Sequence, residues 1–351
     1  MAQARSLAVL GGTGFFGKSI LDAFRRGLLA PWGVERVIAV ARRPDTLRAE
    51  HPELVGEGVE FVALDVAAAG ALPRADYLVH AANTTDARRY AADPAGERAA
   101  ILAAADNFAR LAARDCPDAR IVYASSGAVY GPQPPDVAGL DEDAPLADAA
   151  GLVSTKRDYA EAKRLAEARV AALGREAGVR VAVARCFAFV GPYLPRDGHF
   201  AIGNFLADGM AGRTVTVKAR APVIRSYMHA DDLVRWLLGI ADGAGPGCPV
   251  YNVGSDEGVD VADVAARVAA RYGVAADVPA DRADTPVDRY VPSTARAARE
   301  LGLRLELGLD AAIDATAARL AGDVPSGVPS DVLVRGADSA TSPGRTAVAS
   351  S

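Results

Sequence analysis

Cysteine and histidine are scarce in this 351-residue sequence, and neither residue type is clustered. The three cysteines, Cys116, Cys186 and Cys248, lie far apart, and the four histidines are scattered. Neither set has the paired spacing of zinc ligands, so we expect no metal site. We interpret the cysteines as small buried apolar residues of a protein in a reducing compartment.

Long apolar runs and clusters of basic residues are also lacking. No stretch approaches the roughly 18 consecutive apolar residues that span a bilayer, and the first expected strand begins within about seven residues, which leaves no room for a signal peptide. The formal net charge is -5, with lysine and arginine interspersed among acidic residues, so nucleic acid is not expected as a main partner. We expect a globular, soluble protein of the cytoplasm that does not bind membranes.

A glycine-rich turn joins the first expected strand to the first expected helix. Residues 7–10 are apolar, Gly11, Gly14 and Gly17 follow at intervals of three, and residues 18–26 have a helical pattern. In a dinucleotide-binding turn the first glycine permits the tight bend, the second admits the pyrophosphate, and the third lets helix and strand pack closely. The helix N-terminus then offers free N–H groups to phosphates. A turn with a purely structural role is the alternative.

Strand and helix patterns alternate along the first half of the chain, which predicts a parallel sheet with helices on both faces. We therefore predict an α/β fold, namely a Rossmann doubly wound parallel sheet with a smaller C-terminal α/β part. The expected strands after the first are residues 36–40, 58–64, 75–80, 120–124 and 179–185, and the two long helices are residues 95–114 and 154–176.

The regular alternation stops beyond the last of these strands. We assign residues 1–185 to an NAD(P)-binding domain and residues 186–321 mainly to a substrate-binding part, with residues of about 226–255 returning to the first domain. Residues 322–351 are rich in Gly, Ser, Pro, Thr and Ala, with few large apolar residues. This composition is typical of a disordered tail, which we exclude from the fold.

The ends of the second and third expected strands bear on the choice of cofactor. An Asp or Glu after the second strand accepts a hydrogen bond from the ribose 2′-hydroxyl of NAD, whereas an Arg binds the 2′-phosphate of NADP. Arg42 and Arg43 occupy this place, so we favour NADP; solvated surface arginines are the alternative. Asp65 follows the third strand, where it can receive the adenine amino group or cap a turn.

Two small residues, Ala81 and Ala82, follow the fourth expected strand. They suit a backbone that lies against a cofactor, and close helix packing is the alternative. We interpret His80, which precedes them, as a core histidine with satisfied hydrogen bonds rather than as a ligand.

Three residues suggest proton transfer next to a nicotinamide ring. Ser126 follows the fifth expected strand, at the edge of the sheet where ligands gather. Tyr159 and Lys163 are four residues apart on an expected helix and therefore share a face. An ammonium and a positively charged nicotinamide both favour the phenolate, so Tyr159 could exchange a proton with a substrate hydroxyl while Ser126 hydrogen-bonds the same oxygen. In the alternative, Tyr159 only packs and Lys163 pairs with Glu167.

In this order and spacing, the motifs resemble the extended short-chain dehydrogenase/reductase family, in its branch of nucleotide-sugar epimerases, dehydratases and reductases. The resemblance covers residues of about 5–320. It rests on GGTGFFG at residues 11–17, HAA at 80–82, SSGAVYG at 125–131, Tyr159 with Lys163, RSYMHADD at 225–232 and YNVG at 251–254.

The resemblance implies a Rossmann domain that binds NAD or NADP, a smaller part that binds a nucleoside diphosphate sugar, and a homodimer formed through residues 95–114 and 154–176. The catalytic residues it implies are Ser126, Tyr159 and Lys163. The implied cofactor-binding residues are Gly11, Thr13, Gly14, Phe15, Phe16, Gly17, Arg42, Arg43, Asp65, Val66, Ala81, Ala82, Tyr159 and Lys163. The implied substrate-binding residues are Ser126, Gly127, Ala188, Asn204, Arg225, which would reach the diphosphate, and Arg282, which would add to that clamp.

Three positions depart from the family pattern. The 4,6-dehydratases of the family carry an Asp-Glu pair where Gly127 and Ala128 stand, and the UDP-glucuronate decarboxylases carry a Glu at the second position. Neither residue here can act as an acid or base, which disfavours both activities. An Asn that often contacts the sugar in the epimerases is replaced by Ala188.

The remaining chemistry is oxidation and reduction at one sugar carbon, usually C4. We predict a 4-epimerase; the alternative is an NADPH-dependent 4-ketosugar reductase, which Arg42 and Arg43 favour. A redox enzyme for a non-sugar alcohol or ketone, or a non-catalytic dinucleotide sensor, is a further alternative. The Ser, Tyr and Lys argue against the sensor, and Arg225 with Tyr227 argues for a diphosphate substrate.

Overall fold

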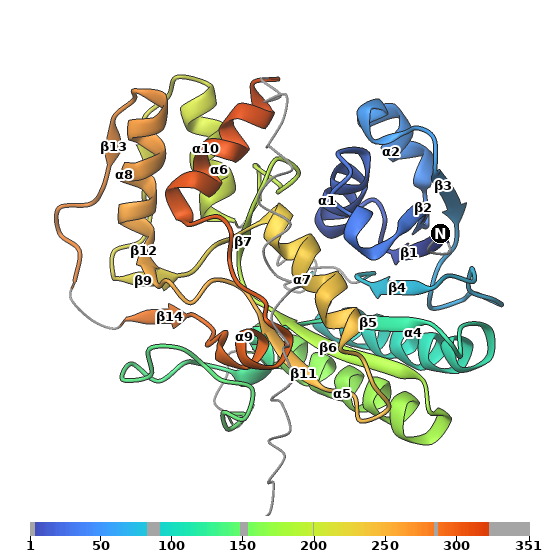
Figure 1. Ribbon diagram of the computed structural model, residues 1–351. Helices are drawn as coiled ribbons and strands as arrows, with labels where there is room; N and C mark the ends of the chain where they lie inside the picture. The colour runs from blue at the N-terminus through green and yellow to red at the C-terminus, as the bar shows by residue number, and fades with distance from the viewer. Residues whose placement is uncertain (1–3, 83–91, 148–153, 199, 284–286, 323–351) are drawn as a thin grey trace, which may run out of the picture.

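The structure is a computed structural model that describes residues 4–82, 92–147, 154–198, 200–283 and 287–322 (Figure 1). The predicted tail lies outside the described residues except for Gly322.

A parallel sheet forms the centre of the molecule. The described residues build seven strands in the order β11-β6-β5-β4-β1-β2-β3, and every pairing between them is parallel. The predicted α/β class and parallel sheet are therefore confirmed. The strands are β1 (Arg5–Leu10), β2 (Val34–Ala41), β3 (Val59–Ala63), β4 (Tyr77–His80), β5 (Arg120–Ser126), β6 (Arg180–Cys186) and β11 (Val250–Val253).

Helices cover both faces of the sheet, as a doubly wound fold requires. Alternate residues of a strand point to opposite faces, and in β1 Leu7 and Val9 belong to one buried cluster whereas Ala8 and Leu10 belong to another. The helices around the sheet are α1 (Phe15–Arg25), α2 (Pro44–Glu50), α4 (Pro94–Asp115), α5 (Ser154–Ala177), α7 (Ala230–Asp242) and α9 (Ala295–Leu301). The first cluster includes residues of α1 and α7, and the second includes residues of α4 and α5, which lie side by side in Figure 1.

Most of the remaining elements pack together on the other side of the molecule, at the upper left of Figure 1. Their own hydrophobic cluster joins α6 (Ala201–Met210), α8 (Val261–Tyr272) and α10 (Leu309–Leu320). Beside it, β12 (Val259–Asp260), β9 (Val223–Arg225) and β14 (Asp288–Tyr290) form a small sheet. The other short strands pair in twos: β7 (Phe189–Val190) with β10 (Met228–His229), and β8 (Val215–Thr216) with β13 (Ala276–Asp277).

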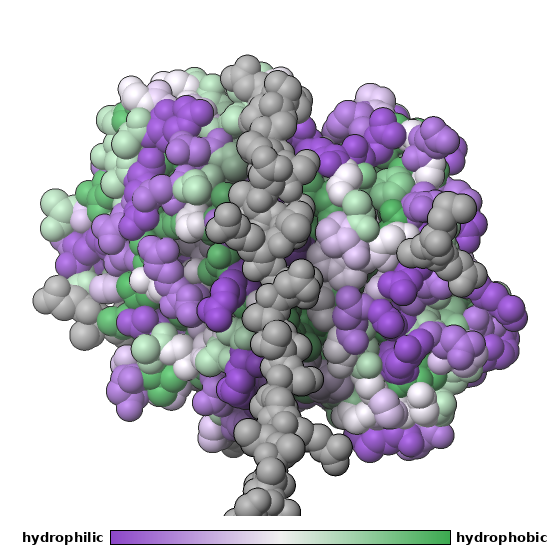
Figure 2. Space-filling view, viewed as in Figure 1, coloured by the Kyte–Doolittle hydropathy of each residue, from purple (hydrophilic) through white to green (hydrophobic). Residues whose placement is uncertain are grey.

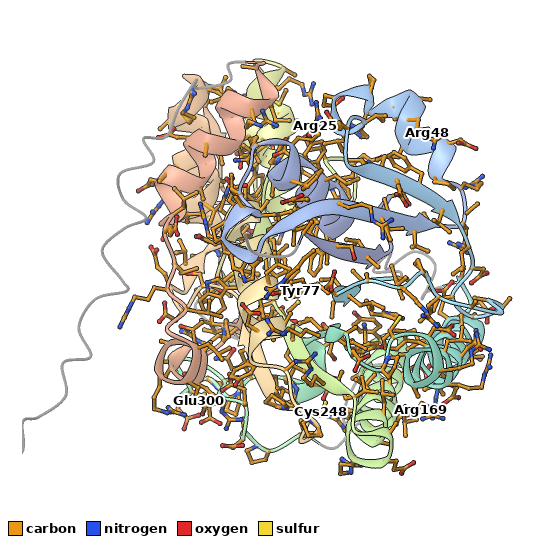
Figure 3. The ribbon with its side chains drawn as sticks, turned by 45° about the vertical axis from the view of Figure 1, so that its right-hand side comes forward. Arg25, Arg48, Tyr77, Arg169, Cys248 and Glu300 are labelled. Carbon is orange, nitrogen blue, oxygen red and sulfur yellow. The ribbon has the colours of Figure 1, made fainter. Side chains whose placement is uncertain are left out.

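A polar network closes the amino ends of the central strands. The hydroxyl of Tyr77, near the centre of Figure 3, accepts hydrogen bonds from Arg5 at 3.0 Å and from Arg120 at 3.1 Å and donates to Asp242 at 2.9 Å. Asp242 is the last residue of α7. The network therefore ties three strands to one helix at the edge of the sheet opposite the edge where ligands are expected.

The face of the molecule shown in Figure 2 is mostly polar. In the view of Figure 2, hydrophilic residues cover much of the outer surface and hydrophobic residues appear in small separate patches.

All three cysteines are buried and free, as predicted. No helix among the described residues combines the length and apolarity needed to cross a membrane. The large hydrophobic side chains described as exposed are Val55, Leu146, Leu165 and Met210.

Candidate active site

The glycine turn between β1 and α1 has the geometry that its spacing predicts. Gly11 has a φ of 97°, and a β-carbon there would lie 2.6 Å from the carbonyl oxygen of Ala81. Gly17 packs against the backbone of Gly12 so closely that no side chain fits. Gly14 is the N-cap of α1 and has no side chain to occupy the first N–H groups of the helix. This cradle and the uncapped helix N-terminus fit the pyrophosphate of a dinucleotide.

Two adjoining pockets lie along the carboxyl ends of the strands and share Gly11, Gly14 and Ala81. Their volumes are about 620 Å³ and about 350 Å³. The predicted site residues on the larger pocket are Gly11, Gly14, Phe15, Phe16, Ala81, Ser126, Tyr159, Lys163, Ala188 and Arg225. Those on the smaller pocket are Gly11, Thr13, Gly14, Arg42, Asp65, Val66, Ala81 and Ala82. Gly17, Arg43, Gly127, Asn204 and Arg282 line neither pocket.

The floor of the larger pocket brings together the three predicted catalytic residues. Ser126 ends β5, and its hydroxyl accepts a hydrogen bond from the N–H of Ala128 at 3.2 Å. Lys163 is only 2% exposed and donates to the carbonyl oxygen of Ala124 at 3.2 Å. Its ammonium lies 5.9 Å from the ring centre of Tyr159. A hydroxyl, a phenol and an ammonium thus converge at the carboxyl end of β5.

The alternative pairing of Lys163 with Glu167 is wrong. Glu167 instead receives two hydrogen bonds of 3.2 Å and one of 2.9 Å from the guanidinium of Arg185, at the end of β6. Both side chains are about 10% exposed. The neighbouring arginine therefore satisfies this carboxylate and leaves Lys163 directed at the pocket floor.

Burial dominates the protonation of this floor. It raises the pKa of Tyr159 to about 12, against a smaller lowering by a hydrogen bond from Ser126, and it lowers the pKa of Lys163 to about 8. In the protein alone the pKa of Tyr159 is therefore raised and not lowered, because desolvation of the phenolate is the largest effect on it. The contribution of a positively charged nicotinamide stays a prediction.

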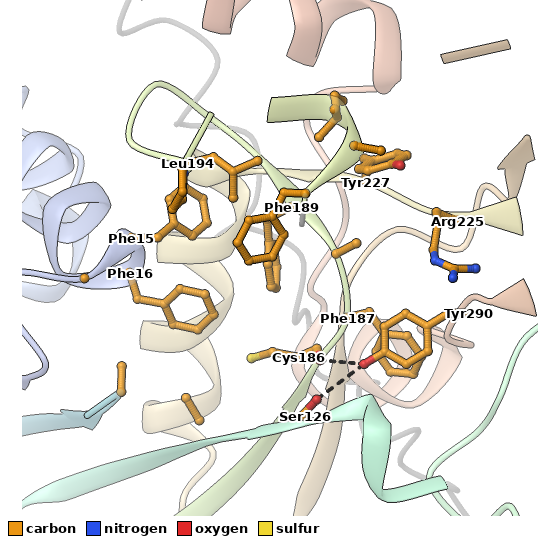
Figure 4. A pocket seen from close by; sticks show the side chains of 18 of the residues that line it. Phe15, Phe16, Ser126, Cys186, Phe187, Phe189, Leu194, Arg225, Tyr227 and Tyr290 are labelled. Carbon is orange, nitrogen blue, oxygen red and sulfur yellow. Dashed lines mark hydrogen bonds between the residues drawn. The ribbon is translucent and has the colours of Figure 1, made fainter. Parts of the chain in front are cut away.

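Tyr290 is a site residue that the sequence did not reveal. It comes from β14 in the C-terminal part, and its hydroxyl lies 3.4 Å from Ser126 Oγ and donates to the carbonyl oxygen of Cys186 at 3.3 Å (Figure 4). Its ring packs against that of Phe187 with 4.5 Å between the ring centres. No motif marks Tyr290, because only the tertiary fold brings β14 to the end of β5.

Gly127 has no room for a side chain. A β-carbon at this position would lie 2.6 Å from the ring of Phe187. Gly127 is buried and forms part of the short 3-10 helix that follows Ser126. None of the described residues that line the larger pocket is Asp or Glu. Among the described residues, therefore, no carboxyl side chain is present in this pocket to act as an acid or a base.

Arg225 reaches the larger pocket but is already bound. Its guanidinium donates to the backbone carbonyls of Ile224 and Asp288, both at 2.9 Å, and to the Asp288 carboxylate at 2.8 Å. The register of the small sheet places Arg225 opposite Tyr290 on the neighbouring strand. An anionic ligand at Arg225 would therefore compete with Asp288 and lie close to Tyr290.

Two predicted substrate contacts lie off the pocket walls. The guanidinium of Arg282 donates to both carboxylate oxygens of Asp260, at 2.9 and 3.0 Å. The side-chain amide of Asn204 donates to the carbonyl oxygen of Gly198 at 3.0 Å. Both side chains are directed to local partners, because a salt bridge or a loop carbonyl is within their reach. Their contacts with a substrate stay predictions.

The predicted site residues that follow β2 and β3 include Arg42 and Asp65, which both line the smaller pocket. Arg42 is exposed and lines the smaller pocket, whereas Arg43 is the N-cap residue of α2. The carboxylate of Asp65 accepts from the N–H of Ala67 at 3.0 Å, so it does cap a turn while facing the smaller pocket.

His80 is a core histidine, but the expectation of satisfied hydrogen bonds is wrong. Its ring is fully buried, with its centre 4.6 Å from that of Phe108 and 4.9 Å from that of Tyr123. Neither ring nitrogen has a hydrogen-bond partner in the part of the chain that the structure describes. Burial, with a smaller effect of Lys163, lowers the pKa of His80 to about 3. The ring is therefore neutral, and aromatic contacts replace polar ones.

Comparison with known proteins agrees with this geometry. A family model described as the NAD dependent epimerase/dehydratase family matches residues 7–254. The chain belongs to this family. Among the residues that the structure describes, no three or more His, Cys, Asp or Glu side chains lie together in a way that could hold a metal ion.

Two curated relatives from Arabidopsis thaliana show how far the similarity extends. UDP-glucuronic acid decarboxylase 5 is 28% identical over 155 residues, which is 43% of this chain and 42% of the relative. The match thus spans less than half of that relative's length. UDP-glucuronate 4-epimerase 1 is 24% identical over 249 residues, 68% of this chain and 56% of the relative.

Solved structures of two 4-epimerases share the fold. A UDP-galactose 4-epimerase is 25% identical, with a TM-score of 0.70 over 91% of this chain and 99% of the other. The UDP-glucose 4-epimerase of Thermus thermophilus, solved with NAD, has a TM-score of 0.73 at 23% identity over 91% of this chain and 100% of the other. These comparisons therefore show that the chain has a Rossmann-type fold.

Proposed function

We propose that this protein oxidises and reduces C4 of a nucleoside diphosphate sugar with NAD(P), as a 4-epimerase. The observation that carries the proposal is the convergence of Ser126, Tyr159 and Lys163 on the floor of a pocket that shares its glycine turn with a second pocket. We place the cofactor on residues 1–185, with its adenosine half in the smaller pocket, and the sugar between this part and residues 186–321.

The residues on the floor divide the proton chemistry between them. Tyr159 takes the proton of the C4 hydroxyl and returns it, and Ser126 hydrogen-bonds the same oxygen throughout. The Lys163 ammonium, held by Ala124, stabilises the phenolate of Tyr159 in the intermediate state. When bound, the nicotinamide supplies the hydride acceptor and donor. For epimerisation the 4-keto sugar must turn over in the pocket before the hydride returns to its other face.

The walls of the pocket support a reaction limited to C4. Elimination of water, as in a 4,6-dehydratase, needs an additional acid and base, and no Asp or Glu lines the larger pocket among the described residues. Phe187 occupies the space that a side chain at residue 127 would need. We therefore rank the dehydratase and decarboxylase activities below the 4-epimerase, although decarboxylases are among the relatives.

A 4-ketosugar reductase that consumes NADPH is the second candidate, and one observation favours it. Arg42 lines the smaller pocket at the end of β2, where a guanidinium can bind a 2′-phosphate. The same position supports NADP over NAD as the cofactor. A reductase would use the same floor, with Tyr159 giving its proton to the newly formed C4 alkoxide.

We also propose a homodimer formed through α4 and α5. The two helices pack against each other, and the guanidinium of Arg98 on α4 binds Glu161 on α5 at 3.0 Å. Arg169 on α5, labelled in Figure 3, binds Asp106 on α4. Exposed small or apolar residues on their outer sides, Ala99, Ala103, Leu165 and Ala168, permit close approach of a second copy. Light scattering at micromolar concentration tests this; a monomer contradicts it.

The decisive experiment combines substrate screening with one variant. Thermal stability is measured with UDP, dTDP, GDP and CDP sugars, and each stabilising sugar is then followed by NMR at C4 with NAD, NADP or NADPH. Conversion between C4 epimers without net use of cofactor supports the epimerase, and stoichiometric oxidation of NADPH supports the reductase. Stabilisation by none of the sugars would contradict both.

Tyr159→Phe should lower turnover at least 100-fold while cofactor binding is retained, because it removes only the proton donor. Tyr251→Phe is a matched control, since the Tyr251 hydroxyl bonds Glu300 at 3.2 Å and does not line the larger pocket. Full turnover by Tyr159→Phe would remove this residue from the mechanism. Retained cofactor without any turnover in the wild type would favour a sensor.

A further inference from the structure

The larger pocket has an apolar wall that faces its catalytic floor. Nine of its lining residues belong to, or pack against, the hydrophobic cluster of the C-terminal part, and we use this name for the six large apolar ones: Phe15, Leu194, Phe200, Ile202, Val223 and Val261. Segments beyond β6 contribute all of them except Phe15, which belongs to α1. The ring of Phe189 extends the wall, with its centre 6.2 Å from that of Phe15 and 5.3 Å from that of Phe16 (Figure 4).

The polar side chains of the pocket are gathered elsewhere. Ser126, Tyr159, Lys163 and Tyr290 lie around the floor, where the reacting oxygen is placed. Arg225, two residues beyond Val223 on β9, and Tyr227 mark the side of the small sheet. Burial raises the pKa of the Tyr227 phenol, and Arg225 lies close enough to lower it to a smaller extent. Apart from Lys163, Arg225 is the only cationic side chain among the described residues that line this pocket. Substrate substituents that point away from both places meet hydrocarbon.

A hydroxyl or carboxylate group pressed against such a wall loses its water and gains no hydrogen bond from these side chains. A methyl group in the same place gains favourable burial. A carboxylate would also be unpaired, because Arg225 already binds Asp288 and no further cation lies on the wall among the described residues. Such a wall favours a methyl group over a hydroxyl or carboxylate on any sugar carbon that faces it.

We infer that the substrate is a 6-deoxy sugar nucleotide, whose C5 methyl group faces the apolar wall, and that sugars with a C6 hydroxyl or carboxylate are poor substrates. This inference rests on the proposed function, because it takes C4 as the reacting carbon. The chemistry of the wall bears only on the sugar. The nucleotide is to be identified by the thermal-stability measurements with UDP, dTDP, GDP and CDP sugars.

Matched sugar pairs test the inference. Turnover at C4 is measured for UDP-6-deoxyglucose against UDP-glucose and UDP-glucuronate, and for dTDP-6-deoxyglucose against dTDP-glucose, or for the corresponding 4-keto compounds with NADPH. We expect kcat/KM to be at least tenfold higher for the 6-deoxy member of each pair. Equal or higher kcat/KM for a 6-hydroxy or 6-carboxylate sugar overturns the inference and leaves the proposed function intact. No turnover and no thermal stabilisation by any of these sugars overturns the proposed function itself.

Two variants test whether the wall is the cause. Val223→Thr and Val261→Thr add a hydroxyl to the wall with little change in shape, and each should reduce the 6-deoxy preference at least threefold. Val59→Thr is the matched control, because Val59 is a partly exposed strand residue away from both pockets. Retained cofactor binding shows that a variant is folded. An unchanged preference in both wall variants overturns the assignment of selectivity to the wall.

Discussion

The hydroxyl groups of Tyr290 and Ser126 lie 3.4 Å apart, although 164 residues separate them in the chain. Tyr290 belongs to the small sheet of the C-terminal part, and Ser126 ends the central strand β5. The same tyrosine hydroxyl donates to the carbonyl oxygen of Cys186 at the end of β6. The C-terminal part of the molecule thus contacts the pocket floor through the phenol of Tyr290.

Replacing Tyr290 with Phe should weaken catalysis moderately without unfolding the protein. The ring still packs against Phe187, so only the contacts to Ser126 and Cys186 are lost. A hydrogen bond contributes about 1 kcal/mol, which corresponds to a roughly fivefold decrease in kcat/KM. Steady-state kinetics of Tyr290→Phe beside Tyr159→Phe provide the check: an equally large loss in both would make Tyr290 a proton donor instead.

Lys163 should make stability depend on pH in the alkaline range. Burial lowers its pKa from 10.5 to about 8, so between these values the unfolded chain binds a proton that the folded protein does not. The free energy of unfolding gained from this residue therefore rises with pH across that window. Lys163→Met should be more stable than the wild type at pH 7 by on the order of 2–3 kcal/mol. Urea unfolding at pH 7, 9 and 10.5 should show this difference shrinking; a constant difference contradicts the buried ammonium.

His80 should sensitise the protein to acid. Its pKa is about 3 in the folded state against 6.5 normally, so as the pH falls below 6.5 only the unfolded chain takes up the proton. Stability is lost progressively, by about 2–3 kcal/mol between pH 6.5 and 4.5. Unfolding of His80→Leu and His80→Phe should show a shallower dependence than the wild type. Two variants are compared because each changes the packing against Phe108 differently; equal slopes in all three proteins would contradict the prediction.

The two arginines after β2 should differ in their effect on cofactor choice. Arg42 lines the smaller pocket and Arg43 does not. Hydrogen bonds to a charged group contribute about 1.5–3 kcal/mol, so Arg42→Asp should lower the NADP-to-NAD affinity ratio about 10- to 100-fold. Arg43→Asp serves as the matched control and should change the ratio much less. Calorimetric titration with both dinucleotides measures the ratio, and no change with Arg42→Asp would withdraw the preference for NADP.

Local patterns predicted the parts of the site that follow one another in the chain. Apolar runs predicted the strands from β1 to β6, and the spacing of Gly11, Gly14 and Gly17 predicted the turn, because both depend on residues within a few positions of each other. Ser126 lies near Tyr159 as expected, because β5 and α5 belong to the same repeating pattern of strand and helix.

Other contacts depend on distant segments and could not be predicted in this way. Tyr290 and Val223 reach the pocket on β14 and β9, which are too short to show a clear period in the sequence. Arg282 finds Asp260 within reach, and Glu167 finds Arg185, where the sequence suggested a substrate and a lysine as partners. A charged side chain can pair with any of several oppositely charged groups, and only the folded structure determines which of these groups lies within reach.

The place of β11 has a consequence for how the chain is made. This strand pairs with β6 on the far edge of the central sheet, yet 63 residues lie between the end of β6 and its start. A ribosome that has released only the first 186 residues therefore presents β6 as an open edge to every other nascent chain nearby. The central sheet therefore cannot be completed early, because its last strand is synthesised only after residues 187–249, which include α6 and α7.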